Sequence, residues 1–184
     1  MKIAILGWGS LLWEQRPPFD NQHGPWSENG PTLELEFSRI SSSRRGALTL
    51  VIDPVHGTPN RVAFSVSRRS NLNTAIADLR KREATTSDRI GFLAVTSGRH
   101  RSYYGAVLDT IRVWATEANI DALVWTDLPS NFSDRTGPEF SVQAAIEYLT
   151  GLDPAAREIA HTYIRRAPAF IQTPVRRAVS GMLQ

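Results

Sequence analysis

The segment that decides the fold lies near the N-terminus and reads Ile3-Ala4-Ile5-Leu6-Gly7-Trp8-Gly9-Ser10-Leu11. A short continuous apolar run that ends at a glycine is typical of a buried strand leading into a tight loop. We therefore predict a strand over residues 2–6. Gly7 and Gly9 let the backbone turn sharply and let a ligand approach the loop amides, which can form an anion-binding nest.

This glycine loop matches neither of two common glycine signatures. A dinucleotide fingerprint needs a third glycine at position 12, where the chain has Leu12. A nucleophile elbow around Ser10 needs glycines at positions 8 and 12, which are Trp8 and Leu12. Two interpretations stay open: the loop cradles a ligand, or it is a plain turn between two apolar segments.

The patterns downstream of the loop predict a group of strands and then helices. Strands are expected over residues 33–37, 48–52 and 61–66, joined by short turns as antiparallel neighbours. Further strands are expected over residues 91–96, 103–108, 111–116 and 120–126. Helical spacing of apolar residues predicts helices that begin near Leu72, Val142 and Pro154, with Ser70 or Asn71 capping the first and Asp153 the last. This order, without regular alternation, is typical of an α+β fold.

Glu83 stands out at the end of the helix that begins near Leu72. It follows Leu79 by four residues and so continues the apolar face if the helix extends that far. A carboxylate there would be partly desolvated, and its pKa would rise toward the range useful to a general base. Arg80 and Arg82 are expected on the solvated face. If the helix ends at Arg82, Glu83 instead begins a loop that faces water, and the spacing leaves both alternatives open.

Two short motifs resemble the γ-glutamylcyclotransferase-like superfamily. Trp8-Gly9-Ser10-Leu11 is similar to the Tyr-Gly-Ser-Leu/Asn loop of that family. Leu79-Arg80-Lys81-Arg82-Glu83 resembles the helix-end segment that carries its catalytic glutamate. The resemblance covers about residues 1–125. It implies an α+β fold with a small mixed β-barrel and flanking helices, in a single domain over residues 1–184 to which the C-terminal helices of about 138–167 are appended.

The resemblance also implies an activity. The family cyclises a γ-glutamyl compound to 5-oxoproline and releases an amine, without a metal or an organic cofactor. Glu83 would be the catalytic general acid and base, and the backbone amides of Trp8, Gly9, Ser10 and Leu11 would bind the substrate. Trp8 stands where many relatives have tyrosine, and its indole N–H keeps one donor there, so the identity of the substrate stays open. The alternative is a non-catalytic module on the same fold that binds a small molecule or a peptide.

Composition excludes several classes of protein. With 184 residues and no cysteine, the chain suits one domain and excludes a disulfide scaffold, thiolate metal sites and a cysteine nucleophile. The four histidines show no metal-ligand spacing, so no metal is expected. The dispersed arginine pairs match no nucleic-acid motif, and no apolar run is long enough to span a membrane. We therefore expect a cytoplasmic protein with a small-molecule partner, no nucleic-acid or membrane partner and an undetermined oligomeric state.

Overall fold

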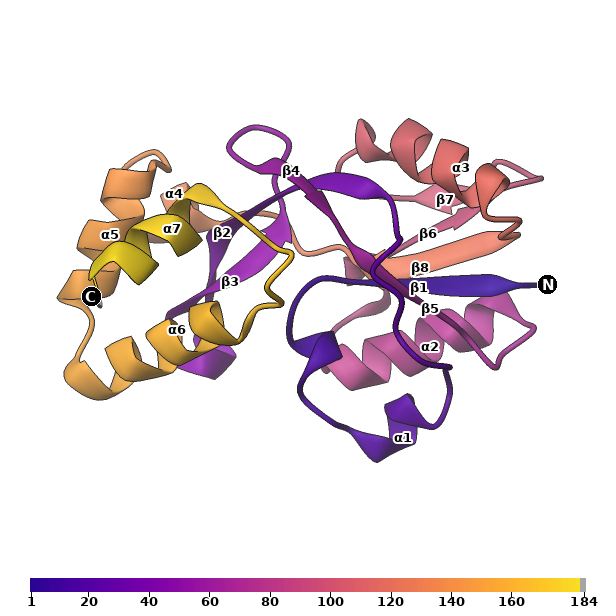
Figure 1. Cartoon of the computed structure of the whole chain (residues 1–184), viewed down its shortest axis with the longest axis horizontal. Helices are drawn as coiled ribbons and strands as arrows, with labels where there is room; N and C mark the ends of the chain where they lie inside the picture. Colours follow the sequence, from indigo (N-terminus) through magenta and orange to yellow (C-terminus); the bar gives the residue numbers. More distant parts are fainter. Residues whose placement is uncertain (183–184) are drawn as a thin grey trace. The chain divides into compact units, whose positions relative to one another are not determined.

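The computed structural model describes residues 1–182 and divides the chain into two compact units (Figure 1). Unit 1 combines Met1–Leu33 with Arg61–Leu128, and unit 2 combines Glu34–Asn60 with the chain from Pro129 onward. Each unit has its own sheet and its own helices. The single domain over residues 1–184, with the helices of about 138–167 appended, stays a prediction.

Unit 1 is built on a five-stranded sheet of order β5-β1-β8-β6-β7. The strand β1 (Ile3–Gly7) is buried along its whole length. It pairs in parallel with β8 (Ala122–Thr126) and antiparallel with β5 (Ala63–Val66). On the other side of β8, β6 (Ile90–Ala94) and then β7 (His100–Arg101) add antiparallel strands. Because β1 has a neighbour on both sides, the loop after Gly7 starts from inside the sheet rather than from an edge.

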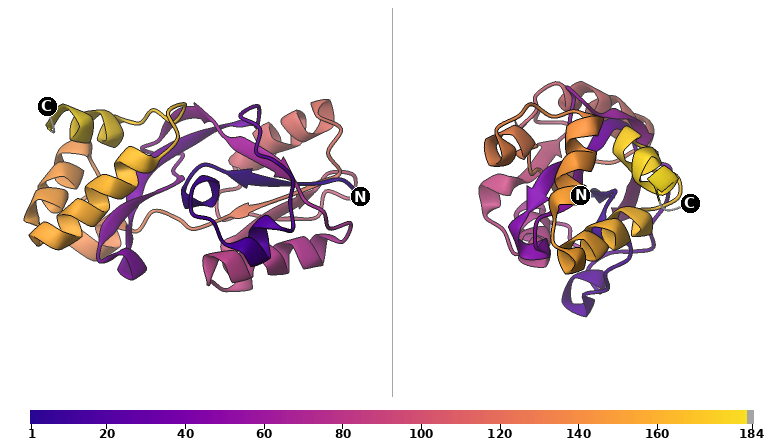
Figure 2. Two further views of the ribbon diagram at one scale, coloured as in Figure 1. Left: turned by 60° about the horizontal axis from the view of Figure 1, so that its bottom comes forward. Right: turned by 90° about the vertical axis from the view of Figure 1, so that its left-hand side faces the viewer.

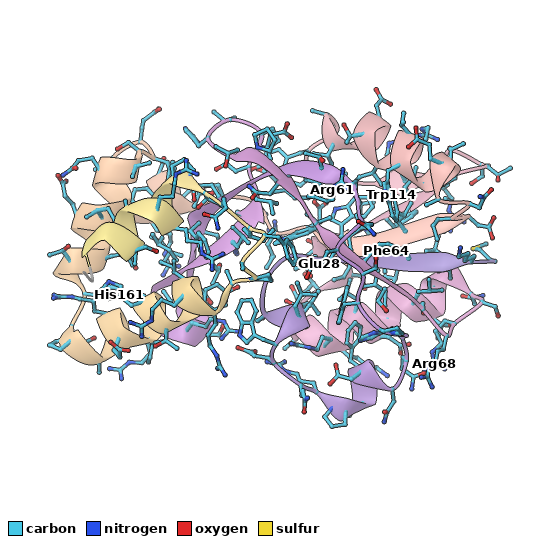
Figure 3. The ribbon with its side chains drawn as sticks, viewed as in Figure 1. Glu28, Arg61, Phe64, Arg68, Trp114 and His161 are labelled. Atoms are coloured by element: carbon cyan, nitrogen blue, oxygen red, sulfur yellow. The ribbon has the colours of Figure 1, made fainter. Side chains whose placement is uncertain are left out.

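Short and long helices complete unit 1. They are η1 (Ser10–Leu12), α1 (Pro17–Asp20), α2 (Leu72–Glu83), η3 (Ser87–Arg89) and α3 (Val107–Glu117). Helix α2 lies along β8 (Figure 1). Helix α3 contacts β5 through its aromatic side chain: Phe64 of β5 packs against Trp114 of α3, with ring centroids 4.9 Å apart (Figure 3).

Helix α2 forms as its sequence predicts. The side chain of Asn71 accepts a hydrogen bond from the Thr74 amide at 3.1 Å and caps the first turn. Leu72, Ala75 and Leu79 are buried in one hydrophobic cluster with residues of β1 and β8. Three basic residues in the last turn favour the negative end of the helix dipole. The helix continues through Glu83 and ends where the next residue turns left-handed, with φ 49°.

Unit 2 pairs a three-stranded sheet of order β3-β2-β4 with a group of helices. The strands are β2 (Thr32–Ser41), β3 (Ala47–Ile52) and β4 (Thr58–Arg61), and η2 (Ser42–Arg44) joins the first two. The helices are α4 (Phe132–Thr136), α5 (Val142–Gly151), α6 (Pro154–Arg166) and α7 (Pro174–Met182). Helix α6 lies against β3, and α5 and α6 both contact α7 (Figure 2). Asp153 caps α6, as predicted, by accepting from the amides of Ala155 and Ala156.

The α+β class is confirmed, but the expected β-barrel is wrong for the described residues. Neither sheet closes on itself. Closure requires the first and last strands of one sheet to pair, whereas β5 and β7 lie at opposite edges and β7 has only two residues. The strand expected over residues 61–66 is interrupted at Val62, and its two parts, β4 and β5, join different sheets.

Two expected strands are also wrong. Residues 111–116 lie in the helix α3, and of residues 103–108 the first four lead into this helix through a turn while the last two already belong to it. Val107, Ile111 and Ala115 are the buried residues of this helix, at a spacing of four. That spacing places them on one helical face, although the β-branched residues among them favour a strand locally. Burial of the helical face therefore outweighs local strand preference in this segment.

Candidate functional site

The glycine loop begins with a close contact inside unit 1. A Cβ atom on Gly7 would lie 2.9 Å from Cζ3 of Trp26, closer than real side-chain contacts allow. Gly7 is therefore a glycine because the ring of Trp26 lies against the backbone at the end of β1. At this position the close approach that the sequence suggests for a ligand is made by an aromatic side chain.

The four loop residues predicted to bind substrate differ in exposure. Trp8 is 5% exposed, Ser10 and Leu11 are each 9% exposed, and Gly9 is half-buried. After Gly9 the chain tightens into η1, in which the Leu12 amide donates to the Gly9 carbonyl at 3.0 Å. The Glu14 amide donates to the Ser10 carbonyl at 2.8 Å. The turn is thus held by its own backbone, with the carbonyl groups of Gly9 and Ser10 both accepting hydrogen bonds from amides that follow them.

Arg82 connects the end of α2 to the glycine loop. Its Nη2 atom donates to the Ser10 carbonyl at 3.1 Å and to the Glu14 carbonyl at 2.9 Å. The residue is 4% exposed, so the prediction that Arg82 is solvated is wrong. Burial lowers the pKa of Arg82 from its usual range, and the neighbouring Glu83 carboxylate opposes that shift. These bonds join two segments that are 72 residues apart in the chain.

Glu83 is the last residue of α2, so the helix extends to the predicted catalytic carboxylate. Its side chain is 18% exposed, and Oε1 lies 3.6 Å from Nη1 of Arg82. The same guanidinium group that faces Glu83 therefore reaches the Ser10 carbonyl.

A cleft of about 380 Å³ opens beside the loop, within unit 1. Leu11 and Leu12 contribute to it from the loop, and Trp26 contributes the ring that lies against Gly7. Asp20 and His23 supply polar groups. The sequence does not predict either residue as a site residue. The two lie three residues apart, and this spacing is too common to distinguish them from ordinary surface pairs.

The structure thus links the end of α2, which carries Glu83, to Ser10 of the loop through Arg82. A site that Glu83 shares with Trp8, Gly9 and Leu11 stays a prediction. Among residues 1–182, no group of three or more histidine, aspartate or glutamate side chains is arranged to hold a metal ion. No helix of the described chain has the length and apolar character needed to cross a membrane. Comparison with known proteins finds neither a matching family model nor a matching curated protein.

Proposed function

We propose that the chain is a γ-glutamylcyclotransferase-like enzyme, which converts a γ-glutamyl compound to 5-oxoproline and releases an amine. The observation that carries this proposal is the bonding of Arg82 to the carbonyls of Ser10 and Glu14. It anchors the helix end that bears Glu83 against the loop with which Glu83 would share a substrate. The resemblance of the two motifs indicates the activity. The contact that Arg82 makes with the loop gives a structural reason for the two motifs to act together.

The reaction needs few groups. The α-amine of the glutamyl moiety attacks its own γ-carbonyl, so that one C–N bond forms and the bond to the leaving amine breaks. Because both reacting groups belong to one molecule, holding it in a folded conformation supplies much of the rate. Glu83 accepts a proton from the α-ammonium and delivers it to the leaving amine. The loop amides at Trp8, Gly9, Ser10 and Leu11 stabilise the negative charge on the γ-carbonyl oxygen or bind the glutamyl carboxylate.

The surroundings of Glu83 suit this role. The side chain is largely buried, and its Oε1 atom, which faces Arg82, is buried completely, so a substrate would reach the carboxylate through the rest of its 18% exposed surface. Arg82, which is held by two backbone carbonyls, fixes the position of the carboxylate through the ion pair at 3.6 Å. A base held in one orientation is effective because proton transfer requires hydrogen-bond reach to the substrate.

The test is the rate of 5-oxoproline formation by Glu83→Gln. The wild type is offered a panel of γ-glutamyl amines, γ-glutamyl amino acids and glutathione, and 5-oxoproline is measured by mass spectrometry. We expect turnover of at least one of these compounds and a loss of about 10²–10⁴-fold in kcat for Glu83→Gln, with an unchanged circular dichroism spectrum. Glu117→Gln, which changes an exposed carboxylate at the end of α3, is the matched control and keeps the wild-type rate.

Two results contradict the proposal. If Glu83→Gln cyclises substrate at the wild-type rate, Glu83 is not the general acid and base. If the wild type binds a γ-glutamyl compound but forms no 5-oxoproline from any member of the panel, the chain is a non-catalytic binding module instead.

A further inference from the structure

The cleft beside the glycine loop contains a buried polar atom that the fold leaves without a partner. His23 is 7% exposed, and its Nε2 atom makes no hydrogen bond within the described residues 1–182. Its ring lies between those of Phe19 and Trp26, with centroids 5.0 Å from each. A buried polar atom without a hydrogen bond is costly, so its presence in the wall of a cleft indicates a ligand.

The hydrogen bonds of the ring fix which nitrogen carries the proton. Nδ1 lies 2.7 Å from the Gly24 carbonyl, and a carbonyl oxygen can only accept. Nδ1 therefore carries the hydrogen and donates it. The hydroxyl of Ser65 donates to the same carbonyl at 2.7 Å and lies 3.0 Å from Nδ1. In the neutral ring, Nε2 is then an acceptor.

A second acceptor faces Nε2 across a short gap. Oδ1 of Asp20 lies 3.9 Å from Nε2, too far for a direct hydrogen bond. The other oxygen of Asp20 accepts from the Arg16 amide at 2.6 Å, which holds the carboxylate in place. Two acceptors at this separation are bridged by a group with at least two N–H donors, and a primary ammonium group has three.

The charges nearby favour a cation over an anion. The carboxylates of Glu14, Asp20 and Glu83 and the guanidinium groups of Arg16 and Arg82 interact in one cluster. Arg16 lies 3.6 Å from Glu14, and Arg82 lies 3.6 Å from Glu83. Three carboxylates and two guanidinium groups give this cluster a net negative charge. The face of an indole, which Trp26 contributes to the cleft, also attracts cations.

We propose that this cleft binds a small organic amine, with its primary ammonium group between Asp20 and His23. The ammonium donates to Oδ1 of Asp20 and to Nε2 of His23, whose separation of 3.9 Å lets one donor group reach both. The apolar part of the ligand lies against Trp26 and Leu12. This binding site is independent of the proposed cyclotransferase activity, because an amine can bind there whether or not the protein cyclises a γ-glutamyl compound.

The test compares three probes of nearly equal size: phenethylamine, 2-phenylethanol and phenylacetate. Each is titrated into the protein, and binding is followed through the indole N–H signals in ¹H–¹⁵N spectra and by calorimetry. We expect phenethylamine to bind at least tenfold more tightly than the neutral alcohol, and phenylacetate to bind more weakly than either. Asp20→Asn keeps an acceptor for the Arg16 amide and removes the charge, so it lowers the affinity for phenethylamine at least tenfold and leaves that for the alcohol unchanged.

Glu28→Gln is the matched control, since it removes an exposed carboxylate from the same segment outside the cleft (Figure 3). It keeps the affinity of the wild type. The proposal is overturned if phenethylamine and the alcohol bind equally, if Asp20→Asn and Glu28→Gln behave alike, or if phenethylamine does not bind at millimolar concentration. Since the readout is binding, a protein without cyclotransferase activity can still pass this test, and an active one can fail it.

Discussion

The two units both bury acidic side chains, but they use them differently. In unit 1, Asp20 and Glu83 keep part of their surface exposed, and they face the imidazole of His23 and the guanidinium of Arg82 respectively. In unit 2, Glu36 is completely buried and its oxygens accept from the backbone amides of Phe37 and Val175, at 2.7 and 3.3 Å. The second arrangement holds α7 to β2, whereas in the first Asp20 lines the cleft, where a ligand can reach it. A carboxylate whose acceptors are occupied by backbone is structural, and one that faces a cleft is available for chemistry.

The largest expected effect concerns Arg82, which makes the corresponding structural link in unit 1. Arg82→Ala removes a buried charge that binds two loop carbonyls and takes the ion-pair partner at 3.6 Å away from the largely buried Glu83 carboxylate. We expect the free energy of unfolding to fall by about 3–5 kcal/mol, measured by urea denaturation. Lys81→Ala, at the exposed neighbouring position, stays within about 0.5 kcal/mol of the wild type. If the two changes lower the free energy of unfolding equally, Arg82 does not stabilise the contact between α2 and the loop.

A smaller effect tests Glu36 through the pH. Burial raises the pKa of Glu36 above its ordinary value of 4.5, and the nearby Asp53 acts in the same direction. The folded state therefore binds this proton more tightly than the unfolded state does. The resulting stabilisation is fully present below pH 4.5 and is lost as the pH rises through the raised pKa.

Glu36→Gln removes that titration. We expect the unfolding free energy of the wild type to fall relative to Glu36→Gln as the pH rises from about 4 to 7. Denaturant titrations of both proteins across this range measure the difference. If it stays constant with pH, Glu36 does not change its protonation between the folded and unfolded states, and its contrast with Asp20 and Glu83 is lost.

The smallest expected effect compares one helix cap from each unit. Asn71 caps α2 through one amide, and Asp153 caps α6 through two. Asn71→Ala and Asp153→Ala each lower the free energy of unfolding by about 1 kcal/mol, with the larger loss at Asp153. Thermal unfolding by calorimetry measures both, and the reverse order would show that the number of capped amides does not set the loss.

Most of the regular structure follows from the sequence. The strand before Gly7, the antiparallel pair β2 and β3, and the helices α2, α5 and α6 all lie where apolar spacing and capping residues predict them. The prediction of a strand over residues 111–116 is wrong because the β-branched residues in this segment favour a strand locally. The burial of Val107, Ile111 and Ala115 on one helical face depends on the folded core and has no local signal.

The candidate site is predicted less completely. The glycine loop and the end of α2 are visible as motifs, but the contact that joins them depends on Arg82, whose burial no local pattern indicates. His23 is a clearer case. Its tautomer is set by Gly24 next to it and by Ser65, which is 42 residues away along the chain. A role that depends on such a distant partner has no signature in the residues around it.

The pairing of β1 with β8 also sets the order in which the molecule can be made. Ile3 lies beside Ala122, and the Lys2 amide donates to Asp121 across a separation of 119 residues. At about 5–20 residues per second, a ribosome needs roughly 6–24 s to supply that partner. Throughout this interval one side of an entirely apolar strand has no neighbour. The residues of β1 are therefore translated long before the strand that encloses them, so this part of the sheet closes only after β8 has been made.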